Sequence, residues 1–78
     1  MSLGLTLALT PLSPMARCIR ETRQALGMTQ AALAAFLGVT VSTVSRWECG
    51  HVHPSPIAWG LLRERAALRG VVVGEPHA

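Results

Sequence analysis

Residues 40–46 carry the side chains whose types and spacing suggest the most specific chemistry in this 78-residue sequence. On a helix that begins at residue 41, the outward side presents Val41, Ser42, Ser45 and Arg46. Such short side chains let a helix lie deep in a groove, and an arginine can donate two hydrogen bonds to O6 and N7 of guanine. The segment is therefore typical of a helix that reads base edges in the DNA major groove.

A second group of side chains has the chemistry of a metal site. Cys49, His51 and His53 offer sulfur and nitrogen atoms of the kind that bind zinc, and Cys18 is a possible fourth ligand. However, this spacing matches no common zinc module, and a tight loop rarely aims three alternate residues at one ion. We therefore predict no metal and no other cofactor, and a metal-responsive regulator stays open as an alternative.

Four segments with helical spacing must position these side chains, and each follows a hydroxyl residue that can cap it. We predict an all-α bundle of four to five short helices, with a possible N-terminal strand. The four assigned helices run from Pro14 to before Gly27, from Gln30 to Leu37, from about Val41 to Cys49, and from Pro56 to about Leu68.

The two middle helices are short, and the three residues Gly38-Val39-Thr40 join them, which is the spacing of a helix-turn-helix. Ala34 and Gly38 are expected to give the third helix room to cross close by. The inward residues that lock the two helices are expected to be Leu33, Leu37, Val39, Val44 and Trp47.

The sequence from Arg23 to Pro54 resembles the Cro/repressor-type (XRE-like, lambda repressor-like) helix-turn-helix family without a gap over 32 residues. The matching positions are Arg23, Gly27-Met28-Thr29-Gln30, Leu33-Ala34, Leu37-Gly38-Val39, Ser42 to Trp47, Glu48, Gly50 and Pro54. The resemblance implies a regulator that binds double-stranded DNA. Its implied DNA contacts are Gln30, Thr40, Val41, Ser42, Thr43, Ser45 and Arg46, with Gln30 on a phosphate.

The resemblance also implies that Arg23 and Glu48 form a structural pair across the first and third helices. Two departures from the family pattern affect DNA contacts. Val41 replaces a long amide and can touch only a thymine methyl, and the loop after Gly50 carries histidines where relatives usually have Lys or Arg.

The fourth helix has two apolar faces, which is typical of a helix with two partners. We expect Ile57, Leu61 and Leu68 to face the core. The second face is the candidate dimer contact, with members Trp59, Leu62 and Ala66. Residues 1–12 form a leader that is either flexible or a strand, because Leu3 to Leu9 alternate with smaller residues; this leader is the other candidate for the dimer contact. Residues 13–70 form the DNA-binding domain and residues 71–78 a tail.

Composition supports a small, well-packed basic domain. Hydrophobic residues make up 50% and charged residues 14% of the chain, every basic side chain apart from histidine is arginine, and the net charge is +3. Two cysteines are too few for a disulfide framework, and no apolar run is long enough for a membrane span, so we expect a cytoplasmic protein. Four scattered glutamates and no glycine-rich phosphate loop argue against an enzyme.

Together these features predict a sequence-specific transcriptional regulator that inserts helix 41–49 into the major groove, with a homodimer expected on a two-fold operator. The alternative is an antitoxin-type module that neutralises a toxin partner, with DNA binding secondary.

Overall fold

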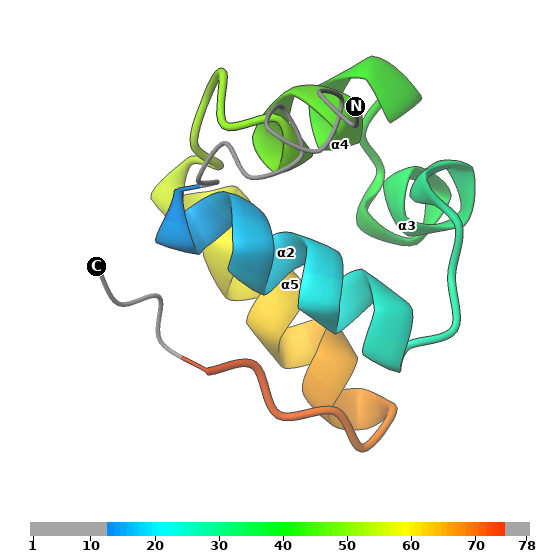
Figure 1. Cartoon of the computed structure of the whole chain (residues 1–78). Coiled ribbons are helices and arrows are strands. Elements are labelled where there is room, and N and C mark those ends of the chain that lie inside the picture. The colour runs from blue at the N-terminus through cyan, green and yellow to red at the C-terminus, as the bar shows by residue number, and fades with distance from the viewer. Residues whose placement is uncertain (1–12, 75–78) are drawn as a thin grey trace, which may run out of the picture.

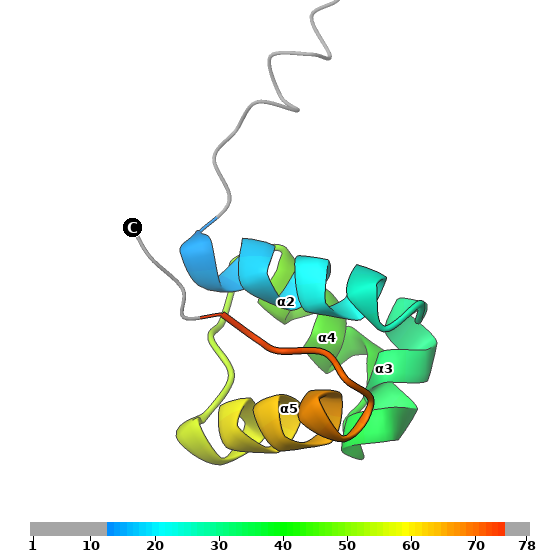
Figure 2. The same cartoon turned by 90° about the horizontal axis from the view of Figure 1, so that it is seen from below.

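The computed structural model describes residues 13–74, which form four helices and no strand. In Figure 2, α2 and α5 lie on opposite sides of the domain, with α3 and α4 packed beside them. The all-α class with a helix-turn-helix is confirmed, whereas the leader, expected to be either a strand or flexible, lies outside the described residues. The helices are α2 (Pro14–Ala25), α3 (Gln30–Leu37), α4 (Val41–Glu48) and α5 (Pro56–Leu68).

Each helix begins at the hydroxyl residue predicted to cap it. The side-chain oxygens of Ser13, Thr29, Thr40 and Ser55 accept a hydrogen bond from the backbone N–H three residues ahead, at 3.0–3.2 Å. A cap of this kind stabilises a helix by about 0.5–2 kcal/mol because it satisfies a donor that has no partner inside the helix. Local chemistry therefore determines where all four helices start.

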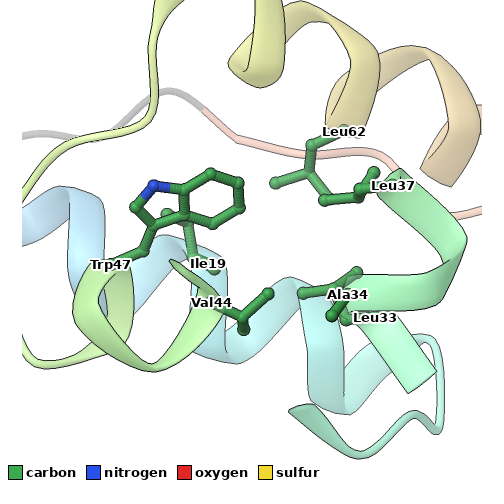
Figure 3. Close-up of a cluster of buried hydrophobic side chains, with 7 residues drawn as sticks. All are labelled: Ile19, Leu33, Ala34, Leu37, Val44, Trp47 and Leu62. Atoms are coloured by element: carbon green, nitrogen blue, oxygen red, sulfur yellow. The ribbon is translucent and has the colours of Figure 1, made fainter. Parts of the chain in front are cut away.

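The core lies where α2, α3, α4 and α5 meet (Figure 3). Trp47 is only 4% exposed, so its predicted core position is confirmed. The helices α3 and α4 both pack through this cluster, and α4 also packs against α2. The tightly buried members are Ile19, Leu33, Ala34, Leu37, Val44, Trp47 and Leu62.

The turn between α3 and α4 needs a glycine for a different reason from the one expected. Gly38 has φ +75°, a left-handed conformation that side chains disfavour. A Cβ atom placed there would meet nothing within 4 Å. The glycine therefore serves the backbone conformation rather than a close helix crossing, and the clearance expectation for Gly38 is wrong.

The two faces of α5 are the reverse of the prediction. Leu62 and Ala66, expected at a dimer contact, are 1% and 0% exposed and lie in the core of the monomer. Trp59, the third expected dimer residue, is half-buried against that core. Ile57 and Leu68, expected in the core, are 84% and 82% exposed. Leu61, also expected in the core, is half-buried and packs against it. The open face is therefore formed by Ile57 and Leu68, two of the three residues assigned to the interior.

After α5 the chain turns back and crosses towards α2 (Figure 2). Val73 is buried, and the Cys18 thiol donates a hydrogen bond to the Gly74 carbonyl at 3.3 Å. Residues 71–74, placed in a tail by the sequence, therefore pack on the domain. None of the helices in residues 13–74 has the length and apolar character needed to cross a membrane.

Candidate nucleic-acid interface

The helix α4 has one face fixed in the core and the other open. Val44 and Trp47 are at most 4% exposed. On the opposite side Val41 is 45% exposed, and Ser42 and Arg46 are exposed as well. Because the buried side chains fix the rotation of the helix, its outward face is presented in one orientation. Figure 1 shows α4 at the rim of the domain.

Hydroxyl groups surround the start of α4. The Thr40 and Thr43 hydroxyl oxygens lie 2.9 Å apart, and the Thr43 backbone N–H donates to Thr40 Oγ1 at 3.2 Å. Thr40 is exposed, while Thr43 and Ser45 are half-buried. The two threonines thus hold the first turn, where unsatisfied N–H groups favour an anion.

A buried carboxylate lies behind this face. Glu48 is 2% exposed, and Arg23 donates to both of its oxygens, from Nε at 2.6 Å and from Nη2 at 3.1 Å. Arg23 also donates to the Met28 carbonyl at 3.1 Å. A two-pronged arginine–carboxylate contact fixes distance and angle together, so this pair holds α2 against α4.

Two further side chains reach the same carboxylate, and neither contact could be predicted from the sequence. Gln30 Nε2 donates to Glu48 Oε1 at 3.1 Å, and Arg20 Nε lies 3.8 Å from that oxygen. An amide nitrogen carries two N–H groups, so this bond leaves Gln30 one donor for another acceptor. Glu48 therefore orients the side chain predicted to contact phosphate.

The surroundings of Glu48 keep its carboxylate ionised. Burial is the largest influence and disfavours the charge, but hydrogen bonds from Arg23 and Gln30, with the nearby positive charges of Arg23 and Arg20, outweigh it. The pKa of Glu48 is therefore below its ordinary value. The hydrogen bond from Arg23 to Glu48 also raises the pKa of Arg23.

Arg65 of α5 and Arg69, which directly follows this helix, both contact α3. Arg65 Nη1 donates a short hydrogen bond to the Phe36 carbonyl near the end of α3. The Arg69 guanidinium lies over the Phe36 ring, 5.0 Å from its centroid. These contacts join α5 to α3, and sequence reasoning missed them because they depend on tertiary placement.

The possible zinc ligands are not gathered at one point. Cys49, His51 and His53 are all exposed, and within residues 13–74 no three Cys, His or acidic side chains are placed to hold one metal ion. The outward face of α4 is therefore a better-defined candidate binding site than the cysteine and histidine residues.

Comparison with protein families matches residues 19–64 to the family described as Helix-turn-helix. No curated protein and no solved structure matches the chain significantly. The matched region contains α3, α4 and the Arg23–Glu48 pair, and covers more than half of the sequence. The chain thus belongs to the Cro/repressor-type helix-turn-helix family of DNA-binding transcription regulators.

Proposed function

We propose that this protein is a sequence-specific regulator that places the outward face of α4 in the major groove of double-stranded DNA. The observation that carries the proposal is the division of α4 into two faces. Val44, Trp47 and Glu48 are buried. The opposite side offers small or short polar side chains and one arginine that can reach a base edge.

Each exposed group on α4 has a chemical role in this proposal. Arg46 donates to a guanine, and Ser42 hydrogen bonds to a base edge near the start of the helix. Val41 contacts a thymine methyl, because a valine side chain has no hydrogen-bonding atom. Thr40, which is exposed, and the accessible parts of the half-buried Thr43 and Ser45 complete the contact.

Phosphate contacts set the depth and angle of α4. Gln30 lies at the first position of α3, where backbone N–H groups favour a phosphate, and its free amide N–H can join them. Since Glu48 holds both Gln30 and Arg23, one buried carboxylate links the phosphate contact to the recognition helix.

A single eight-residue helix reads few base pairs, so we propose that two copies bind a two-fold operator. The centres of its half-sites would be about 34–36 Å apart, one turn of DNA, because both α4 helices must enter the same face of the duplex.

Arg46→Ala should weaken binding to a preferred duplex by about 1–3 kcal/mol and relax the preference at one base position. Competition binding against duplexes that vary one position at a time measures both effects. Arg17→Ala is the matched control, because it removes the same charge from an exposed position on α2. A loss of equal size on every sequence would contradict a base-reading role for Arg46.

Gln30→Ala should weaken binding to all duplexes alike, by about 1.5–3 kcal/mol, because a hydrogen bond to a charged phosphate is lost. The preferred sequence should stay the same. Binding titrations on the preferred and a scrambled duplex provide the measurement, with circular dichroism to show that the variant is folded. A changed consensus sequence would show that Gln30 reads bases.

A further inference from the structure

Side chains from three helices converge on one carboxylate where α2, α3 and α4 meet. Arg20 and Arg23 belong to α2, and Gln30 is the first residue of α3. The carboxylate is that of Glu48, the last residue of α4. Two arginines and one glutamate leave this cluster with a formal charge of +1, and an excess of positive charge attracts an anion.

Arg20 is the member of the cluster whose N–H groups are not used. Glu48 Oε1 accepts from Arg23 Nη2 and from Gln30 Nε2, each at 3.1 Å, which matches the two lone pairs of this oxygen. Arg20 Nε lies 3.8 Å from the same oxygen, which is too far for a hydrogen bond. Within residues 13–74 the Arg20 guanidinium donates no hydrogen bond, so its five N–H groups can serve another acceptor.

Exposure separates the two arginines. The side chain of Arg23 is 17% exposed and holds Glu48 from inside the domain, whereas the side chain of Arg20 is 42% exposed. An exposed ion pair without a hydrogen bond adds little to stability. Arg20 is therefore attracted to Glu48 and held in place by it, but the fold depends on Arg23 rather than on Arg20.

Arg20 also lies beside the side chain proposed to contact phosphate. Arg20 Nε and Gln30 Nε2 are both within 3.8 Å of Glu48 Oε1, so the remaining N–H groups of the two side chains are neighbours. A phosphate group has several acceptor oxygens, and arginine is well suited to bind them. One phosphate can therefore accept from Arg20 and Gln30 together.

We infer that Arg20 is a second phosphate contact, which binds the same DNA phosphate as Gln30 and is held beside it by Glu48. The inference rests on the proposed function, because the ligand is the DNA backbone. It gives α2 a direct part in binding, so that the phosphate is held from α2 and α3 at once. Two anchors on different helices would fix the angle at which α4 enters the groove.

The salt dependence of DNA binding tests the charge contact. Arg20→Ala should weaken binding to the preferred and a scrambled duplex alike, by about tenfold. The slope of log affinity against log salt should fall by about one, because one phosphate contact and its released counterion are lost. Arg20→Lys should keep the slope, since it keeps the charge, and circular dichroism shows whether each variant is folded. An unchanged slope for a folded Arg20→Ala would overturn the inference.

A double-mutant cycle tests whether Arg20 and Gln30 share one phosphate. The double variant Arg20→Ala with Gln30→Ala should bind at least threefold more tightly than the product of the two single losses, because each single variant already disturbs the shared contact. Arg17→Ala is the matched control, since Arg17 is an exposed arginine on the same helix. Its loss should multiply with that of Gln30→Ala, and multiplication in both cycles would overturn the shared phosphate.

The same measurements separate this inference from the proposed function. A chain that prefers one duplex sequence, and whose salt slope is the same with Arg20→Ala, would refute the phosphate contact and keep base reading by α4. A chain that prefers no sequence, but whose salt slope falls with Arg20→Ala, would keep the phosphate contact and refute the base reader.

Discussion

Glu48→Ala is expected to destabilise the domain by about 3–5 kcal/mol, because it leaves the partly buried Arg23 charge without its partner. The substitution also removes the acceptor for Gln30. A domain of 78 residues has a free energy of unfolding of only about 4–12 kcal/mol, so this loss removes at least about a quarter of it. Urea titration followed by circular dichroism measures the loss.

The matched control for Glu48→Ala is Glu64→Ala, which removes an exposed glutamate from α5. Measured at a concentration where the chain is monomeric, it should change the free energy of unfolding by no more than about 0.5 kcal/mol. Equal effects from the two variants would contradict the structural role of the buried carboxylate.

The lowered pKa of Glu48 also predicts a pH dependence. In the unfolded chain a glutamate titrates at about 4.3. Because the folded-state pKa lies lower, the stabilisation from Glu48 is complete above the unfolded value and is lost as the pH falls through the folded one. The stability advantage of the wild type over Glu48→Gln should therefore shrink in acid. A constant difference from neutral pH to strong acid would contradict this linkage.

Trp47→Ala should cost about 3–5 kcal/mol, because it removes the largest side chain of the core and leaves a cavity between α4 and its neighbours. Figure 3 shows the indole reaching from α4 into the cluster with Ile19 and Leu62. Thermal unfolding measures the effect. DNA affinity should fall with the folded fraction, since Trp47 is only 4% exposed and reaches no DNA directly.

The control for this cavity is Val52→Ala, which shortens an apolar side chain in the loop after α4. Val52 is 38% exposed, so this variant should change the free energy of unfolding by less than about 0.5 kcal/mol. Trp47→Phe should lie between the control and the alanine variant, because it keeps an aromatic ring in the site. An unchanged melting temperature for Trp47→Ala would refute the core placement.

The helices could be predicted from the sequence because their boundaries depend on local chemistry. The caps Ser13, Thr29, Thr40 and Ser55 act over three residues, so their effect is visible in the sequence itself. The buried side of α4 was also predictable, since Val44 and Trp47 repeat at helical spacing.

The faces of α5 could not be assigned from the sequence, because both are apolar and periodicity alone gives no preference between them. The packing of α5 against α3 determines which face of α5 is buried. The contacts of Arg65 and Arg69 with Phe36 help to hold α5 in that orientation. The bond from Gln30 to Glu48 escaped prediction for a similar reason, since it joins residues 18 positions apart. The DNA contacts on α4 remain predictions.

Selection of bound duplexes from a randomised pool at physiological salt, followed by sequencing, tests whether α4 reads DNA bases. We expect one enriched site with two-fold symmetry and half-site centres about 34–36 Å apart. We also expect Arg46→Ala to relax one position in each half-site. Weak binding that falls with salt and enriches no sequence would contradict the claim that α4 reads DNA bases.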